Sequence, residues 1–293
     1  MLHNRKKTVQ LGDQAVGAGL PVYIVAEIGI NHNGNLKLAK RLIDAAKSAG
    51  CNSVKFQKRK PELCVPKGEK TKKLETPWGY ISYLEYRKKI EFGHKEYQEI
   101  DRYCRKRGIA WFVSVWDTPS VDFMEQFRPM CYKVPSAMLS DADLLMRVRK
   151  TGRPVILSTG MSTMRQIQSS VKVLGIRDLI INHCTSAYPC PVEELNLRMI
   201  TRLGQMFDCP IGYSGHEVGL ATTVAAVALG ACYIERHITL DRAMWGTDQA
   251  ASVEPGGFSR LVKYIRVVEA ALGDGIKKIY DSERPAMRKL RRI

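Results

Sequence analysis

Short apolar runs alternate with segments of helical spacing along almost the whole chain. Eight runs are rich in Val, Ile and Tyr and too short for helices, so they predict buried β-strands. These strands are expected at Val22–Ile28, Ser53–Phe56, Ala110–Val115, Cys131–Val134, Pro154–Leu157, Leu179–Asn182, Pro210–Tyr213 and Cys232–Ile234. Between them, apolar residues recur at intervals of three or four, which predicts helices. The helices are expected at Leu36–Ala49, Glu96–Lys106, Ala142–Lys150, Met164–Leu174, Leu195–Leu203, Leu220–Leu229 and Phe258–Leu272, with one more beginning at Pro119.

This alternation predicts an α/β fold, specifically a (β/α)8 TIM barrel in a single domain. Eight strand–helix units spaced by roughly 20–40 residues match the pattern and the length of such a barrel. A doubly wound open sheet is the alternative, but no GxGxxG motif follows the first strand, and polar residues follow all eight strands. We expect the catalytic barrel over residues 1–281, including an N-terminal extension at 1–21, and a basic tail over 282–293.

Composition narrows the class of protein. No apolar run approaches the ~20 residues that span a bilayer, and the basic N-terminus leads into no hydrophobic signal segment. The eight cysteines form no CxxC pair, and several lie within apolar runs. This usage favours reduced core residues in a cytoplasmic protein with no membrane partner.

The formal net charge of +17 favours an acidic partner, either nucleic acid or small anions such as phosphates and carboxylates. Basic clusters such as Arg87–Lys89, Arg105–Arg107 and Arg288–Arg292 fall in helical or terminal segments without interleaved aromatic residues. We interpret most of the excess as solvent-exposed helix faces and expect no nucleic-acid partner.

Residues capable of chemistry lie at the ends of the predicted strands. Unpaired charge is costly inside a buried strand, and the C-terminal ends of parallel strands build the active site of an α/β barrel. One pocket is therefore expected to collect these side chains. In chain order they are Glu27, Asn31, Lys55, Gln57, Ser114, Asp117, Lys133, Ser136, Ser158, Thr159, His183, Thr185, Ser186, Tyr188, Ser214, His216, Glu235, His237 and Asp248.

Two lysines among these residues indicate an anion site. Lys55 and Lys133 lie within core strands, where a lysine needs an anion, and nearby serines could complete a site for phosphate and carboxylate groups. The alternative is that Ser and Thr simply cap the following helices, as we expect for Thr118 and Thr163.

Two histidines are candidates for a metal site. His216 and His237 end neighbouring strands, where their rings could meet a common divalent ion. Two imidazoles alone are a weak signal, because protein sites of this type usually have three or more ligands. His32 and His94 are expected to be structural.

These residues lie in seven motifs that together closely resemble the N-acetylneuraminate (sialic acid) synthase family. The motifs are Ala26–Gly34, Val54–Gln57, Tyr132–Ser136, Ile156–Met161, His183–Pro189, Gly212–His216 and Ile234–Asp248, and they occur in order across nearly the whole chain. The resemblance implies a TIM-barrel enzyme that condenses phosphoenolpyruvate (PEP) with an open-chain amino sugar and water. The products would be a nine-carbon 2-keto-3-deoxy sugar acid and phosphate.

The resemblance also implies roles for individual residues. A divalent ion, typically Mn²⁺ with Mg²⁺ or Co²⁺ as alternatives, would be bound by His216 and His237. PEP would be held by Lys55, Lys133, Ser136, Ser158, Ser186 and Ser214. The sugar would face Glu27, Gln57, Tyr188, Glu235 and Asp248. The catalytic residues would be Glu27, Lys55, Lys133 and Asp248, and we expect Glu27 to position or deprotonate the attacking water.

Two departures from the family affect the expected site. Ser186 stands in HCTS where family members commonly have HCTN, so its side chain would reach less far toward its ligand than asparagine would. The chain also ends near the point where many relatives begin a small antifreeze-like (SAF) domain, which supplies an arginine to the sugar's N-acetyl group from the partner subunit of a dimer. A different sugar, a separate polypeptide, or local residues such as Arg242 or Trp245 would then complete this half of the site. Homodimerisation is a further expectation from the resemblance.

Two competing interpretations fit the same sequence. Another PEP–aldose synthase, of the 3-deoxy-octulosonate-8-phosphate or 3-deoxy-heptulosonate-7-phosphate type, would use a sugar phosphate, which the positive charge would suit. A catalytically idle, basic barrel that serves as a binding protein belongs to a different class. That second interpretation predicts loss of site residues, whereas the acids, lysines and histidines are all present.

Overall fold

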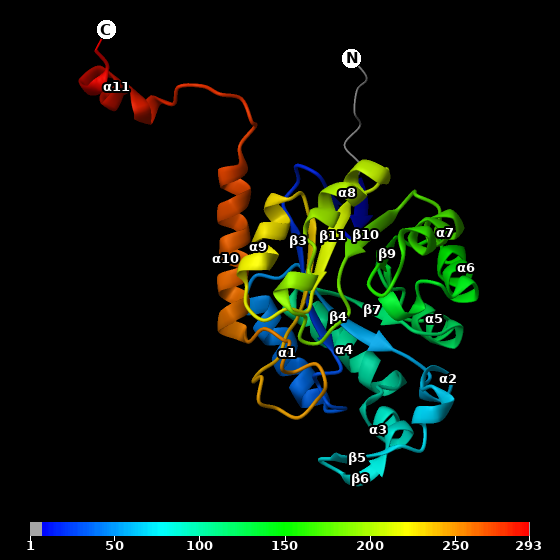
Figure 1. Ribbon diagram of the computed structural model, residues 1–293. Coiled ribbons are helices and arrows are strands. Elements are labelled where there is room, and N and C mark those ends of the chain that lie inside the picture. Colours follow the sequence, from blue (N-terminus) through cyan, green and yellow to red (C-terminus); the bar gives the residue numbers. More distant parts are fainter. Residues whose placement is uncertain (1–7, 293) are drawn as a thin grey trace.

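Eight parallel strands close into a barrel within residues 8–292, the part of the chain that the computed structural model describes (Figure 1). In chain order the strands are β3 (Tyr23–Gly29), β4 (Ser53–Lys58), β7 (Ala110–Val115), β8 (Tyr132–Val134), β9 (Val155–Ser158), β10 (Leu179–His183), β11 (Ile211–Gly215) and β12 (Tyr233–His237). Each strand pairs with its successor, and β12 pairs with β3 to close the ring. The predicted (β/α)8 fold is confirmed.

Helices cover the outside of this barrel. They are α1 (Leu36–Ser48), α4 (His94–Arg107), α5 (Thr118–Glu125), α6 (Ala142–Lys150), α7 (Met164–Leu174), α8 (Arg198–Met206), α9 (Ala221–Ala228) and α10 (Pro255–Leu272). Thr163 caps α7 as expected, because its side chain accepts a hydrogen bond from the Gln166 N–H. The expected cap at Thr118 is wrong: Asp117 caps α5 and accepts from the Ser120 N–H at 2.7 Å.

The alternation of side chains along each strand separates the core into two layers. Ile24, Ala26 and Ile28 of β3 point outward and pack against the helices in the larger hydrophobic cluster. Tyr23 and Val25 point into the barrel, where they join a smaller cluster with residues from other strands. Every second residue of a strand points inward, so the next inward position on β3 is Glu27. Its carboxylate therefore lies inside the barrel, at the C-terminal end of the strand.

A hairpin closes the opposite end of the barrel. Strands β1 (Thr8–Leu11) and β2 (Gln14–Gly17) pair antiparallel, and Val9, Leu11 and Val16 bury their side chains against the inner cluster. The sequence predicted only an extension with turns here, because two four-residue strands carry little apolar pattern.

The long connection between β4 and α4 contains small elements of its own. These are α2 (Pro61–Cys64), η1 (Lys67–Glu69), β5 (Lys73–Thr76), β6 (Gly79–Ser82) and α3 (Tyr83–Ile90). Trp78 and Tyr86 meet Trp245 of the loop after β12 at ring-centroid distances of 6.0 and 5.0 Å. The connection is therefore fixed beside the C-terminal ends of the strands, at the edge of the barrel mouth.

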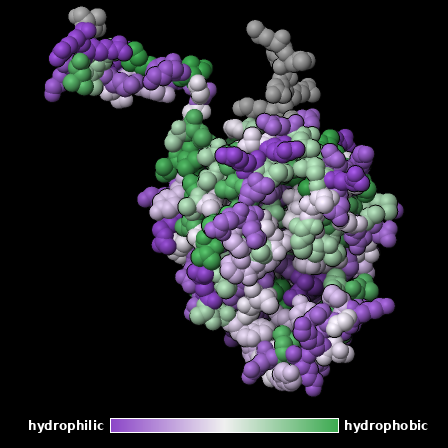
Figure 2. Space-filling model, in the orientation of Figure 1, coloured by the Kyte–Doolittle hydropathy of each residue, from purple (hydrophilic) through white to green (hydrophobic). Residues whose placement is uncertain are grey.

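The remaining elements are short. Turns of 3-10 helix occupy η2 (Ser136–Met138), η3 (Val192–Glu194) and η4 (Asp281–Glu283), and the last helix is α11 (Arg284–Leu290). Figures 1 and 2 show α11 projecting away from the barrel, whose visible face mixes hydrophilic and hydrophobic residues. Within residues 8–292 no helix combines the length and the apolarity needed to cross a membrane.

Candidate active site

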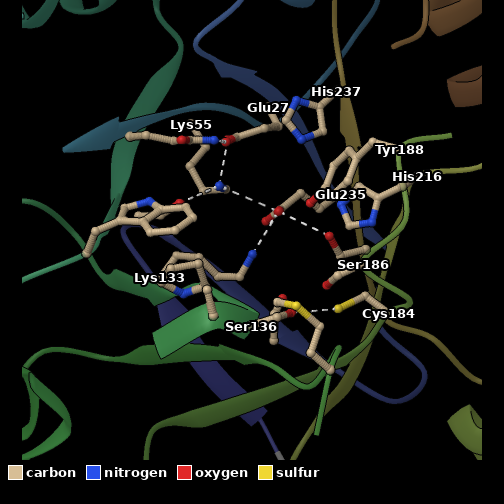
Figure 3. A pocket seen from close by; sticks show the side chains of 18 residues that line it. Glu27, Lys55, Lys133, Ser136, Cys184, Ser186, Tyr188, His216, Glu235 and His237 are labelled. Atoms are coloured by element: carbon tan, nitrogen blue, oxygen red, sulfur yellow. Dashed lines mark hydrogen bonds and ion pairs between the residues drawn. The ribbon is translucent and has the colours of Figure 1, made fainter. Parts of the chain in front are cut away.

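A pocket of about 180 Å³ opens at the C-terminal ends of the barrel strands (Figure 3). Every site residue implied by the resemblance lines it except Asp248. The structure thus brings together Glu27, Lys55, Gln57, Lys133, Ser136, Ser158, Ser186, Tyr188, Ser214, His216, Glu235 and His237. Ser114, from the wider set of strand-end residues, also lines the pocket.

Five other strand-end residues hold the loops instead of lining the pocket. Asn31 donates to the Ile238 carbonyl and to Ser252, Asp117 caps α5, and Thr159 donates to the Asn182 carbonyl. His183 Nε2 lies 2.7 Å from the Leu195 carbonyl oxygen, and Thr185 donates to the Glu194 carbonyl. The pocket also includes residues that the sequence did not single out: Trp116, Pro135, Ala137, Met161 and Cys184.

Four buried charges form a network across the base of the pocket. Lys133 Nζ lies 2.8 Å from Glu235 Oε1, and Lys55 Nζ lies 2.6 Å from Glu27 Oε2 and 3.5 Å from Glu235 Oε1. All four side chains are at least 95% buried. Strands β8 and β12 face each other across the barrel, so Lys133 and Glu235 meet through its interior. Figure 3 shows both lysines pointing toward Glu235.

The two glutamates differ in their surroundings. Glu235 also accepts hydrogen bonds from Ser214 (3.2 Å) and Tyr233 (2.9 Å). Burial opposes its charged form, but Lys133 and Lys55 outweigh burial and hold the pKa of Glu235 well below its ordinary range. For Glu27, burial dominates the opposing effect of Lys55 and raises the pKa to about 7. The two carboxyls, although neighbours, are therefore not chemically equivalent.

Lys55 stays charged in this setting. Burial opposes the charged form of Lys55, but Glu235 and Glu27 outweigh it and raise the pKa of Lys55 above its ordinary value. Lys55 also donates to Ser114 at 2.8 Å. The sequence predicted anions beside Lys55 and Lys133. Within the protein itself, Glu27 and Glu235 supply them. Glu235, which the resemblance assigned to the sugar, lies between the two lysines.

Serine hydroxyl groups line the other side of the pocket. The Gly160 N–H donates to Ser136 Oγ (3.0 Å) and to Cys184 Sγ (3.2 Å). A Cβ atom at Gly160 would lie only 2.3 Å from Ser186 Oγ, so the close approach of this backbone requires glycine. Ser158 Oγ is buried and has no hydrogen-bond partner among the described residues. Free hydroxyl donors of this kind suit an anionic oxygen.

The two candidate metal ligands lie together at one side of the pocket (Figure 3). The rings of His216 and His237 are 5.8 Å apart, and Tyr188 packs on His216 at 4.1 Å. His216 Nδ1 contacts the Thr185 carbonyl at 2.8 Å, which leaves its Nε2 available. His237 Nδ1 is buried without a hydrogen-bond partner and lies 3.9 Å from Asp248 Oδ2.

Burial keeps both imidazoles neutral at ordinary pH. Together with the neighbouring His237, it lowers the pKa of His216 to about 4. It also lowers the pKa of His237 to about 4, against the opposing effect of Asp248. Neutral imidazole is the form that binds metal ions. In the described part of the chain no cluster of three or more His, Cys, Asp or Glu side chains is arranged to hold a metal ion, so other ligands would have to complete the coordination.

The histidines expected to be structural lie away from the pocket. His32 stacks on Phe92 at 4.0 Å, and burial lowers its pKa to about 3. His94 begins α4 and packs against Phe127 at 5.4 Å. Neither ring lines the pocket.

A second, outer cavity of about 410 Å³ adjoins the pocket and contains Asp248. The two cavities share four lining residues: Gln57, Trp116, Ala137 and Tyr188. Arg59 and Arg87 also line the outer cavity and are only 8% and 4% exposed. The interpretation of Arg87 as part of a solvent-exposed helix face is wrong, because α3 turns this side chain toward the barrel mouth.

Comparison with known proteins places the chain in a family. Residues 42–277 match the NeuB family model. The human N-acetylneuraminate-9-phosphate synthase is 42% identical over 94% of this chain and 78% of its own length. The N,N'-diacetyllegionaminic acid synthase of Campylobacter jejuni is 39% identical over 89% of this chain and 80% of its own length.

A solved structure agrees with these sequences. The N-acetylneuraminic acid synthetase of Leptospira borgpetersenii, crystallised with citrate, superposes with a TM-score of 0.88 and 31% identity, covering 98% of this chain and 97% of that one. The chain therefore belongs to the NeuB family, and the resemblance drawn from its motifs is confirmed. The expected class of enzyme is confirmed with it: a PEP-dependent sugar-acid synthase, that is, a transferase that forms a carbon–carbon bond.

Proposed function

We propose that this enzyme condenses PEP with an open-chain, N-acetylated amino sugar and water to give a 2-keto-3-deoxy nonulosonic acid and phosphate. The observation that carries the proposal is the cross-barrel network of Lys55, Lys133, Glu27 and Glu235 at the base of a serine-lined pocket. Two lysines and several serine hydroxyls suit the phosphate and carboxylate of PEP, and the product names of the relatives support an amino-sugar acceptor.

PEP would lie against the lysines and serines. Lys55 and Lys133 would contact its anionic groups, and Ser136, Ser158 and Ser186 would donate hydroxyl hydrogen bonds, while Ser214, whose hydroxyl donates to Glu235, would line the site beside them. Glu235 holds both ammonium groups in place, with its own position fixed by Ser214 and Tyr233. Such preorganised charge stabilises a transition state without reorganisation at the moment of reaction.

The reaction forms two bonds, one to the aldehyde carbon and one to water, before the bond to phosphate breaks. C3 of PEP attacks the aldehyde carbon, water adds to C2, and the bond between C2 and the phosphate oxygen then breaks to leave the keto group. The two protons of water end on the new hydroxyl and on the phosphate. Glu27 is held by Lys55 at 2.6 Å and by Gln57 Nε2 at 3.1 Å. It would face this centre, where it would position the water and accept its proton.

The neutral rings of His216 and His237 fit a divalent ion, and Mn²⁺ is the ion we propose. The buried, unpaired Nδ1 of His237 and the available Nε2 of His216 are nitrogen donors on two rings that lie 5.8 Å apart at one side of the pocket. When Glu27 is ionised the four buried charges sum to zero, so this network by itself does not offset the negative charge of PEP. When bound, the ion would supply that positive charge and polarise the sugar aldehyde as a Lewis acid.

The test is phosphate release from PEP in H₂¹⁸O with N-acetylmannosamine or a diacetamido hexose as acceptor. If water adds at C2, the released phosphate contains no ¹⁸O and its formation depends on the sugar. Sugar-independent release of phosphate carrying one ¹⁸O would show attack of water on phosphorus, and the proposed condensation would be wrong.

A further inference from the structure

The outer cavity beside the catalytic pocket is lined by two buried arginines. Arg59 follows β4 directly, and Arg87 lies on α3, so the connection between β4 and α4 supplies both. Both side chains belong to the group of buried charged residues, and both line the cavity that contains Asp248. Since this cavity shares Gln57 and Tyr188 with the catalytic pocket, one elongated ligand could occupy the two together.

Arg87 has no partner of opposite charge. Among residues 8–292 no group accepts a hydrogen bond or forms an ion pair with its guanidinium, and its Nη2 is buried and unsatisfied. Its guanidinium lies near the rings of Tyr83 and Tyr86, whose centroids are 5.9 and 5.7 Å away. Arginine is rarely buried without a partner, because an uncompensated buried charge is costly. The ligand-free protein therefore lacks the group that this side chain requires.

Arg59 is only partly satisfied. Its guanidinium stacks over Trp116 at 4.0 Å and donates from Nη2 to Gln57, but its Nε is buried without a partner. The carboxylate of Glu91 accepts instead from Lys58 Nζ at 2.9 Å and from the backbone N–H of Arg59 at 3.1 Å. Burial and the nearby Arg87 lower the pKa of Arg59 to about 10, so it is still charged at neutral pH.

Both positive charges therefore lie at the outer cavity with no carboxylate bound to either guanidinium. The acid that lines the same cavity, Asp248, accepts from Thr247 Oγ1 at 2.7 Å and lies 3.9 Å from His237. A sugar hydroxyl or acetamido group could contact the arginines but would leave their charges uncompensated. A phosphate monoester would match them in charge and in geometry, because guanidinium groups bind phosphate oxygens in pairs.

Building on the proposed function, we propose that Arg59 and Arg87 bind a phosphate monoester at the far end of the acceptor sugar. The aldehyde end would then lie in the inner pocket near Glu27 and His237, and Asp248 would contact hydroxyls between the two ends. The inner lysines and serines are already assigned to PEP, so this second anion site is separate from theirs. It makes the acceptor a phosphorylated amino sugar.

The first test compares kcat/KM for N-acetylmannosamine 6-phosphate and for N-acetylmannosamine. The wild-type enzyme is expected to favour the phosphorylated sugar by at least about tenfold. Arg87→Met is expected to lower this ratio by about 10- to 100-fold, the range for a lost charged hydrogen bond. Arg87→Lys keeps the charge without the guanidinium fork and should lower it less. Lys89→Met removes an exposed charge from the same helix and should leave the ratio within about twofold.

A second test does not require turnover. With saturating PEP and Mn²⁺, glucitol 6-phosphate should raise the Tm of the wild-type enzyme and of Lys89→Met, but not that of Arg87→Met, and glucitol should raise none of them. Without ligand, Arg87→Met is expected to unfold at the same or a higher Tm, because an unpaired buried charge has been removed. A lower Tm would instead indicate a structural role for Arg87.

The outcomes separate this inference from the proposed function. If the wild-type enzyme uses the unphosphorylated sugar equally well or better, the phosphate site is wrong and the condensation stands. If no sugar supports turnover, the proposed function fails. The glucitol 6-phosphate measurement then decides the anion site alone: an equal Tm shift in Arg87→Met and the wild type would refute it.

Discussion

The central network can be tested by removing its cross-barrel pair one residue at a time and together. The four charges of Lys55, Lys133, Glu27 and Glu235 sum to zero. Lys133→Met leaves one excess negative charge inside the barrel, and Glu235→Gln leaves one excess positive charge. The double variant restores neutrality, because Lys55 and Glu27 remain paired at 2.6 Å.

The expected size of the effect follows from the geometry. At 2.8 Å, and with an effective dielectric constant of about 20, the attraction between Lys133 and Glu235 is about 6 kcal/mol before desolvation. Removing one partner of a buried pair typically costs about 3–5 kcal/mol. Glu235 retains Lys55, Ser214 and Tyr233 as neighbours, so we expect each single variant to lose about 3 kcal/mol. The double variant should lose less than either single variant.

Urea unfolding measures the free energy of unfolding of the four proteins, and phosphate release from PEP measures their activity. Lys133 contacts PEP in the proposed site, so the double variant should regain stability without regaining turnover. A double variant less stable than both single variants would refute the pairing. A double variant with wild-type KM for PEP would refute the assignment of Lys133 to the PEP site.

Three further variants test other parts of the molecule. Arg236→Met leaves the fully buried Glu217, its partner at 3.0 Å, without its ion pair, so the free energy of unfolding in urea should fall by about 3–5 kcal/mol. A loss below about 1 kcal/mol would contradict this. Gly160→Ala forces Ser186 and Ser136 from their positions and should raise the KM for PEP at least about tenfold with the fold intact, whereas an unchanged KM would remove this loop from the PEP site. His237→Ala should abolish both Mn²⁺ binding, measured by electron paramagnetic resonance, and turnover. Full activity would refute the metal assignment.

The sequence predicted the barrel because its signals are local. Each strand is a short apolar run, and a period of two along it places every second side chain inside the barrel. On β12 this rule carries Tyr233, Glu235 and His237 to one interior row. The residues of the candidate pocket could be predicted for the same reason. The C-terminal ends of parallel strands lie at one end of the barrel, so the side chains there point into one pocket.

Partnerships across the barrel could not be predicted. Lys133 and Glu235 are 102 residues apart and meet only because β8 and β12 come to lie on opposite sides of a closed ring. From the sequence each looked like a ligand-binding group in need of a substrate. The structure shows that each already has a partner of opposite charge.

Burial of the two arginines was missed for a similar reason. Arg59 and Arg87 stand in basic runs with no local signal of a core, so both runs resemble exposed surface. Their burial depends on how the connection after β4 folds back and meets Trp245 through Trp78. Contacts between two long loops leave no periodic pattern in the sequence.

The most direct measurement of the central claim is the mass of the product formed from PEP and an aldose. Purified enzyme with Mn²⁺ would be offered N-acetylmannosamine, its 6-phosphate, mannose, arabinose 5-phosphate and diacetamido hexoses, each with and without EDTA. We expect an N-acetylated amino sugar, free or phosphorylated, to gain the mass of pyruvic acid, with one phosphate released per product and no product when EDTA is present. If PEP binds neither alone nor with any sugar, or if phosphate appears without a condensed product, the enzyme does not catalyse the proposed condensation.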